Sequence, residues 1–150
     1  MNAARAVAAG AIATATMTAL LLIEPAVGLP EIAIGQLLSS SLSMSTAFSS
    51  IGPAVGWLIH FLVGVAFALA YGGLVIGRLR GSPLVRGLMF GVLVFLLGQA
   101  VFLPMVGAGF FSRGDQSMLV GSLLGHLVFG GVLGWIYGEP QADLPGRAAA

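Results

Sequence analysis

The sequence predicts an all-α membrane protein in which four hydrophobic helices cross the bilayer as one bundle. Of its 150 residues, 58% are hydrophobic and 7% are charged, whereas about 25% are charged in an ordinary soluble domain. Four apolar stretches are long enough to cross a hydrocarbon core of about 30 Å, which takes about 20 helical residues. By length, residues 1–150 are expected to form a single domain. The apolar side chains must face something other than water, so membrane lipid is the first expected partner.

The four expected spans cover residues 7–23, 54–76, 87–103 and 118–137. The first is the least hydrophobic, because it is rich in alanine and threonine, and it can be misread as a secretory signal. Three further spans follow it, and no convincing cleavage site precedes them. We therefore expect the first stretch to be a retained helix.

The distribution of arginine predicts the orientation, since positive charge near span ends tends to stay in the cytoplasm. Four spans place both termini and the central loop on the same side of the membrane. That side holds five arginines and the other side one: Arg5, Arg78, Arg80, Arg86 and Arg147 against Arg113. We expect a multi-pass protein with both termini in the cytoplasm.

The connection between the first two spans is expected to hold a short helix on the outer side. Pro30 and Glu31 suit a first helical turn, because proline fits position N1 and an acid favours the positive end of the helix dipole. The apolar residues within 31–38 are too few to cross the membrane. An interfacial or re-entrant helix fits best.

The connection between the third and fourth spans is shorter. It places Phe110 and Phe111 at the membrane boundary. Asp115 or Ser117 is expected to cap the fourth span, because a side-chain oxygen there accepts hydrogen bonds from free N–H groups of the first turn.

The second and fourth spans resemble each other. His60 aligns with His126, and the Tyr-Gly pair at residues 71–72 aligns with that at residues 137–138. The ends of the first and third spans share a Pro-x-Val-Gly sequence. With an even number of spans in each half, the chain reads as two parallel two-helix repeats related by an axis along the membrane normal.

Small residues recur at every fourth position after each of these histidines. Such stripes let helix backbones approach closely, which is how helices in lipid gain packing energy. A shorter stripe of Gly10, Thr14 and Thr18 lies on the first span. The residues expected to pack in this way are Gly64, Ala68 and Gly72 in the second span and Gly130, Gly134 and Gly138 in the fourth.

Two glycine-rich motifs carry a resemblance to a known family. They are the turn Pro-x-Val-Gly-Ala-Gly-Phe-Phe at residues 104–111 and the helix Gly-His-Leu-x-x-Gly-x-x-Leu-Gly-x-x-Tyr-Gly at residues 125–138. Nearly the whole chain resembles an uncharacterised family of small four-span bacterial membrane proteins, a domain of unknown function. The resemblance implies the four-span fold and the bacterial inner membrane, and no catalytic residues come with it.

His60 and His126 are the leading candidate site residues, because an ionisable side chain inside a span is costly and marks a functional site by default. Two opposed imidazoles can ligate haem b, or they can handle a proton or another ligand. Alternatively, each neutral ring simply hydrogen-bonds to a neighbouring helix. We expect both rings to face the bundle interior, with the two histidine helices in direct contact and each imidazole hydrogen-bonded.

Glu24 and Gln99 are candidates for a polar network. Glu24 ends the first span, where it can join the histidines, bind a cation, or lie as an ordinary acid in the headgroup region. Gln99 is the only amide inside an expected span, and the simpler interpretation is that it joins two helices by hydrogen bonds.

The composition excludes several functions. Without cysteine the chain forms no disulfide, thiolate metal site or thiol nucleophile. The net charge of +1 and the absence of lysine argue against a nucleic-acid partner. No phosphate-binding loop, activated nucleophile or pair of acids is apparent, so the expected role is non-catalytic.

We therefore expect an accessory or structural subunit of a larger membrane complex, such as a respiratory or electron-transfer complex. Its partners would be other membrane protein subunits or further copies of the chain. A b-type haem protein that uses the two histidines is one alternative. A small transporter or channel is another, although few polar side chains are available to line a path across the bilayer.

Overall fold

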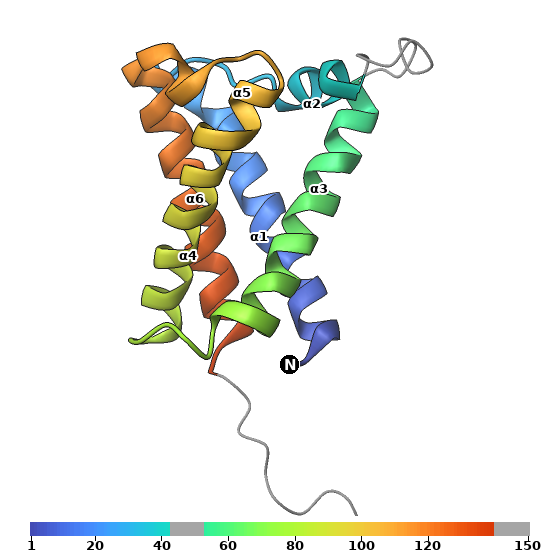
Figure 1. The fold of residues 1–150 in the computed structure, drawn as a ribbon, viewed down its shortest axis with the longest axis vertical. Coiled ribbons are helices and arrows are strands. Elements are labelled where there is room, and N and C mark those ends of the chain that lie inside the picture. Colours follow the sequence, from blue (N-terminus) through green and yellow to red (C-terminus); the bar gives the residue numbers. More distant parts are fainter. Residues whose placement is uncertain (43–52, 140–150) are drawn as a thin grey trace, which may run out of the picture.

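The computed structural model of the protein describes residues 1–42 and 53–139 as a bundle of helices (Figure 1). No β-strand occurs in these residues. Four helical stretches are long and apolar enough to cross a membrane: Ala3–Val27, Ala54–Val75, Pro83–Met105 and Gln116–Tyr137. The four-span, all-α fold predicted from the sequence is confirmed, and the chain is a small multi-pass membrane protein.

Three of the four stretches are runs of consecutive helical segments. The first joins α1 (Ala3–Ile23) to the 3-10 turn η1 (Glu24–Val27), and the second joins α3 (Pro53–Ala70) to the π-helix η2 (Tyr71–Val75). The third joins α4 (Pro83–Leu97), the π-helix η3 (Gly98–Phe102) and the short α5 (Leu103–Met105). The fourth is the single helix α6 (Gln116–Tyr137).

Two of these helices begin one turn earlier than the sequence predicted, because a polar side chain caps each of them. The Asn2 side chain accepts a hydrogen bond from the backbone N–H of Arg5 at 3.0 Å. At the start of α4, the Ser82 hydroxyl accepts from the N–H of Val85 at 3.4 Å. Such caps satisfy free N–H groups of the first turn. The helices therefore include the arginine-bearing turns that a purely apolar criterion leaves out.

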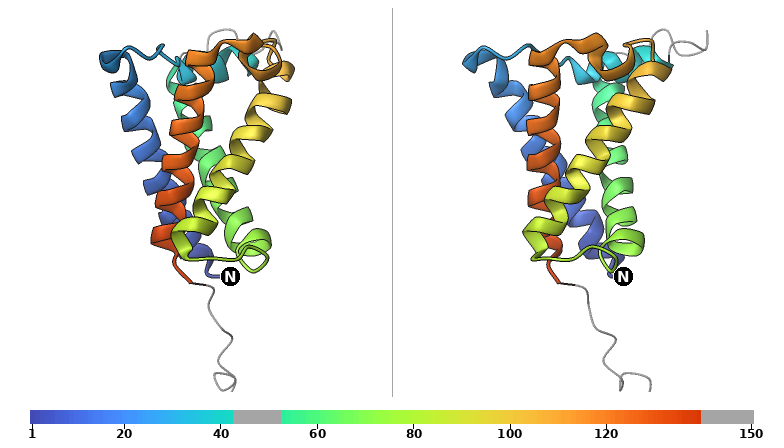
Figure 2. Two further views of the ribbon diagram at one scale, coloured as in Figure 1. Left: turned by 90° about the vertical axis from the view of Figure 1, so that its left-hand side faces the viewer. Right: turned by 60° about the vertical axis from the view of Figure 1, so that its left-hand side comes forward.

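The helices pack as two neighbouring pairs joined through α1 and α6. α3 packs on α1, α4 packs on α6, and α1 packs on α6. α3 and α4 are consecutive in the chain, yet Figure 1 shows them diverging toward the end where α2 lies. Both further views show the same end as the wider one (Figure 2). The two helices that carry histidines, α3 and α6, thus each pack on the span that precedes them in the chain. The internal repeat stays a prediction.

Glycines hold α4 and α6 at close range. A Cβ atom at Gly130 would overlap the carbonyl oxygen of Gly87 and lie 2.7 Å from the Cα of Gly91. A Cβ at Gly134 would lie 2.7 Å from the Cα of Gly87. Because backbone atoms occupy this space, only glycine permits the observed separation of the two helices.

Small residues also line the contact of α1 with α3. A Cβ at Gly10 would lie 2.6 Å from the Cβ of Ala68, and a Cβ at Gly64 would overlap the hydroxyl of Thr14. A Cβ at Gly72 would lie 2.7 Å from the Tyr137 hydroxyl of α6. The small stripe of α3 therefore faces α1, and its last member faces α6.

The short helix α2 (Ile34–Leu42) crosses the bundle at one end, called here the α2 end (Figure 1). The prediction of a short helix in this connection is confirmed, but the assignment of its first turn to Pro30 and Glu31 is wrong. Gly28, with φ 86°, ends η1, and the N–H of Leu29 donates to the carbonyl of Glu24. Proline commonly follows such a C-cap, so Pro30 belongs to the stop of one helix and not to the start of the next.

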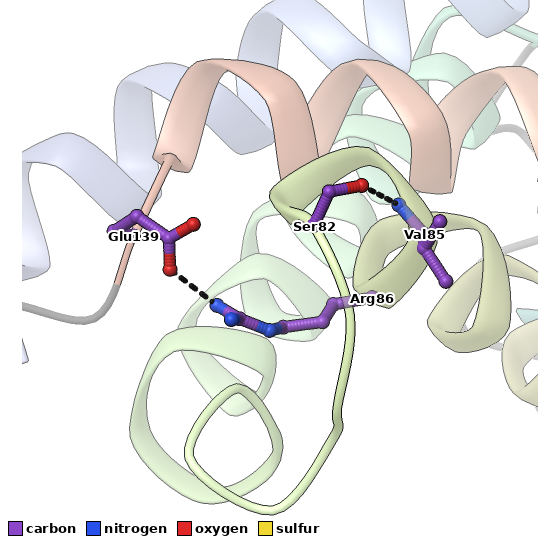
Figure 3. A network of polar contacts seen from close by, with 4 residues as sticks. All are labelled: Ser82, Val85, Arg86 and Glu139. Carbon is purple, nitrogen blue, oxygen red and sulfur yellow. Dashed lines mark hydrogen bonds and ion pairs between the residues drawn. The ribbon is translucent and has the colours of Figure 1, made fainter.

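Polar contacts gather at the opposite end, called here the Glu139 end, where α1 begins and α6 finishes. The Arg86 guanidinium of α4 forms an ion pair with the Glu139 carboxylate at 2.8 Å (Figure 3). The Arg5 guanidinium donates to the carbonyl of Ile136 at 3.1 Å. These contacts tie the first turns of α1 and α4 to the end of α6.

Candidate functional site

A cavity of about 670 Å³ lies in the half of the bundle nearest the α2 end. Its walls come from α1, α3, α4 and α6, while α2 with its preceding segment and the loop after α5 close the end. Most of its lining is apolar, with Met17 from α1, Val63 and Phe67 from α3, Val94 from α4 and Met118 from α6. A concave apolar site with a few convergent polar groups is the usual form of a small-molecule site.

The cavity opens sideways between α3 and α4. Val63 of α3 lines the cavity and is 43% exposed, while Leu97 and Val101 across the opening are 43% and 50% exposed. These side chains line the cavity from spanning helices that are not packed on each other, and they stay partly exposed, so they border lipid. A molecule dissolved in the bilayer can therefore reach the cavity without crossing water.

One polar cluster lies on the wall formed by α4 and α6. Gln99, which is 2% exposed, donates to the Ser122 hydroxyl at 3.0 Å and accepts from the Ser112 hydroxyl at 2.9 Å. Ser112 belongs to η4 (Phe110–Gly114), where three consecutive residues other than glycine have φ between 46° and 55°. This left-handed backbone is costly, so the loop is held in a strained form that delivers a hydroxyl to Gln99.

His126 is oriented by its own helix. Its Nδ1 atom donates to the carbonyl oxygen of Ser122, one turn earlier, at 2.7 Å. In the neutral ring this bond fixes the tautomer, so Nε2 carries the lone pair. A Cβ at Gly98 of η3 would lie 3.9 Å from this Nε2 atom. The free nitrogen of His126 therefore lies beside Gly98 of η3, at the wall of the cavity.

His60 lines the same cavity from α3. Its Nε2 atom is buried and has no hydrogen-bond partner in the described part of the chain. Trp57 and Phe61 contact the ring edge-on, with centroid distances of 5.9 and 6.0 Å. A buried polar atom without a partner is unusual, and it marks a place where a ligand can supply the missing bond.

The expected direct contact between the two histidine helices is therefore wrong. Gly64 and Ala68 of the first stripe are used against α1, and Gly130 and Gly134 of the second are used against α4. The last members of the stripes pack elsewhere, because Gly72 meets Tyr137 of α6 and Gly138 meets the Arg5 side chain of α1. Both rings face the interior as expected, but a cavity lies where the contact was expected. The expectation that each imidazole is hydrogen-bonded holds for His126, whereas Nε2 of His60 has no partner within residues 1–42 and 53–139.

Glu24 is not brought to the histidines. Its side chain is 1% exposed, and neither carboxylate oxygen has a hydrogen-bond partner in the residues that the structure describes. A Cβ at Gly121 of α6 would lie 2.8 Å from Oε2. Glu24 therefore packs against the first half of α6, outside the lining of the cavity.

Asp115 stands at the rim of the cavity and caps α6, as one of the two predicted caps. Its carboxylate accepts from the Ser117 hydroxyl at 2.7 Å and from the N–H of Met118 at 3.1 Å. The hydrogen bond from the Ser117 side chain, followed by that from Met118, lowers the pKa of Asp115. The rim therefore carries a negative charge at neutral pH.

Ser112, Ser122 and Gly98 were missed by the sequence interpretation. The role of Ser122 could have been predicted from the sequence, because a residue four positions before His126 on a helix places its carbonyl next to the ring. The role of Ser112 could not, since its position depends on the left-handed turn of η4. No cluster of three or more side chains suited to a metal ion occurs among residues 1–42 and 53–139.

A family model described as a family of unknown function, DUF6789, matches residues 1–143. The chain belongs to the DUF6789 family. No curated protein and no solved structure matches it. Membership in DUF6789 agrees with the resemblance to an uncharacterised family.

Proposed function

We propose that the protein binds a lipid-soluble small molecule in the cavity between α3 and α4. The observation that carries the proposal is the position of the cavity, which is apolar, faces lipid through a lateral opening and holds two imidazole nitrogens without partners in the described residues. A cavity of about 670 Å³ falls in the range of small-molecule sites, about 300–1,000 Å³. The bundle acts as a receptor or carrier that takes its ligand from the membrane.

Gly98→Leu is the variant that tests this proposal. Gly98 lines the cavity in a right-handed helical conformation, and an added Cβ meets only His126 Nε2, at 3.9 Å. A leucine side chain is therefore tolerated by the backbone and fills the cavity. Gly77→Leu is the matched control, because a Cβ at Gly77 meets nothing within 4 Å and Gly77 lies outside the cavity lining.

The experiment is to purify each variant in a mild detergent, extract it with organic solvent and identify the small molecules by mass spectrometry. We expect a lipid-soluble compound in stoichiometric amount with the wild type and Gly77→Leu, and its loss with Gly98→Leu. The same compounds in equal amounts from all three proteins would contradict the proposal.

An accessory-subunit role is the second candidate, as expected from the sequence. The observation that favours it is the position of α3 at the edge of the bundle, where it packs mainly on α1 and α2. Leu58, Leu62 and Leu74 on this helix are 58%, 60% and 64% exposed. The partner would be a larger membrane protein or a second copy of the chain.

Photo-crosslinking in native membranes tests this second role. A photoreactive residue at Leu62 is expected to capture one defined protein, whereas the same residue at Leu93 of α4, which is 45% exposed, serves as the control. Capture of lipid alone at both positions would rule out a partner on α3.

A further inference from the structure

We propose that the ligand of this cavity is a membrane-soluble hydroquinone, an aromatic ring with two opposite hydroxyl groups and a hydrocarbon tail. The proposal rests on the ligand-binding function above and names the chemistry of the ligand. In the complex, Nε2 of His126 accepts a hydrogen bond from one hydroxyl, Nε2 of His60 meets the other, and the tail leaves between α3 and α4.

Charge is the first argument, because it requires a neutral ligand. No arginine is found among the described residues that line the cavity, and the sequence contains no lysine. The carboxylate of Asp115 lies at the rim, where it repels anions. A buried charge needs a partner, so phosphate headgroups, fatty acids and the two propionates of haem find no counter-ion here.

The tautomer of His126 is the second argument, because it requires a ligand that donates a hydrogen bond. Nδ1 already donates to the carbonyl of Ser122, so Nε2 of the neutral ring is an acceptor. A hydroxyl group satisfies this atom, whereas a ketone or an ether oxygen does not. The reduced form of a quinone carries hydroxyl groups, and its oxidised form carries carbonyl groups.

The position of His60 is the third argument, because its unpartnered nitrogen requires a second polar group on the same ligand as a hydrogen-bond partner. Its unpartnered Nε2 belongs to α3, and that of His126 belongs to α6. These helices pack mainly on other helices, so the two nitrogens enter the cavity from different walls. A rigid ring with hydroxyl groups at opposite ends can reach both, and Phe67 and Phe102 of the lining offer aromatic contacts for its faces.

The test compares three short-tailed compounds by calorimetric titration of the protein in nanodiscs, with empty nanodiscs subtracted. They are a hydroquinone kept reduced under anaerobic conditions, its quinone, and its dimethyl ether. We expect the hydroquinone to bind at least about tenfold more tightly than the dimethyl ether, because the ether leaves buried nitrogens unpaired. The quinone is expected to lie between them, because its carbonyl oxygens accept a hydrogen bond from the Nε2–H tautomer of His60 better than aryl ether oxygens do, while neither compound can donate to His126.

Variants assign the preference to the histidines. His126→Phe and His60→Phe keep a ring in place, and each is expected to reduce the preference for hydroquinone over its dimethyl ether by about fivefold or more. Circular dichroism and thermal unfolding check that each variant folds. If a phenylalanine variant does not fold, the leucine variant of the same histidine, which also lacks a hydrogen-bonding group, is measured in its place with the same expected loss of preference.

The outcomes separate this inference from the proposed function. Equal binding of all three compounds to the wild type, abolished by Gly98→Leu, would overturn the hydroquinone assignment and leave the cavity as a general apolar site. No binding of any compound would overturn both. A Soret band in the purified wild type that vanishes in both phenylalanine variants would replace the hydroquinone by haem b with two imidazole ligands.

Discussion

The glycine contact between α4 and α6 offers a direct test of how the bundle holds together. In Gly130→Ala, the new Cβ overlaps the carbonyl oxygen of Gly87 and lies 2.7 Å from the Cα of Gly91. Backbone atoms cannot rotate away, so the helices must separate by about 1 Å before carbon atoms reach an ordinary contact distance. Overpacking of this kind costs about 1–3 kcal/mol. We expect a loss of about 2 kcal/mol in the free energy of unfolding.

Gly131→Ala is the matched control, one residue further along α6. Its Cβ would meet side-chain atoms of Leu84 and Leu88 at 3.4 Å, which is an ordinary contact that flexible leucines can adjust. Its unfolding free energy should stay within about 0.5 kcal/mol of the wild type. Reversible unfolding in mixed micelles of rising sodium dodecyl sulfate content, followed by circular dichroism, measures both variants. Equal stability of Gly130→Ala and Gly131→Ala would refute the packing argument.

The same contact predicts that substitutions on the two helices are not additive. A Cβ at Gly87 would overlap the carbonyl oxygen of Gly130, the reciprocal of the clash described above. One separation of the helices relieves both clashes. The double variant Gly87→Ala/Gly130→Ala should therefore lose less stability than the sum of the single variants, and full additivity would place the two clashes at independent sites.

Three further predictions concern polar residues and topology. Gln99→Leu removes the partner of two serine hydroxyls and should cost about 1–3 kcal/mol in the same micelle assay; a change no larger than that of lipid-facing Leu96→Ala would argue against the hydrogen-bonded cluster. Because its hydrogen bonds lower the pKa of Asp115, the stability that they give is present at neutral pH and is lost as the pH falls through the lowered pKa. Asp115→Asn should remove this part of the acid sensitivity, and an unchanged pH profile would count against it. Reporter fusions at Arg80 and after Glu139 should both report the cytoplasm, since the arginine bias predicts that side; an outer-side signal at both positions would reverse the orientation, and at one of them it would contradict the four-span topology.

The spans were predictable from the sequence because they depend on composition and length alone. Hydrocarbon thickness dictates how many apolar residues a helix needs, and four stretches meet that length. The cap of α6 was also predictable, because an acid just before an apolar run has a local structural meaning. The spans are decided by the composition of one continuous stretch, and the cap by residues within one helical turn.

The partners of the small-residue stripes were not predictable in the same way. The stripes after His60 and His126 indicate that backbones approach closely, but they do not say which helix approaches. Matching the two stripes to each other gave a contact between the histidine helices. The structure instead uses most of each stripe within its own helix pair, α1 with α3 and α4 with α6, while Gly72 and Gly138 lie where α1, η2 and the end of α6 meet. The cavity results from this pairing of the helices, so no local sequence pattern could predict it.

Pro30 shows a second limit of local reasoning. A proline followed by an acid suits a helix start, and it suits equally well the position after a helix end. Gly28 decides between the two positions, because its positive φ ends η1 just before Pro30. The N–H of Leu29, which donates to the carbonyl of Glu24, completes this helix end. Only a comparison of the end of η1 with the start of α2 would have assigned Pro30 to the end of the first helix.

The π-helix η3 sets the direction in which the side chains that follow it point. A π-helical turn holds about one residue more than an α-helical turn, so it changes the rotational phase of everything that follows. Leu103, Met105 and Ala108 lie beyond it and form part of the cavity lining. If the same five residues were wound as α-helix with no change in length, these side chains would turn by about 100° around the axis. The wider turn of η3 therefore directs the side chains that form the roof of the cavity.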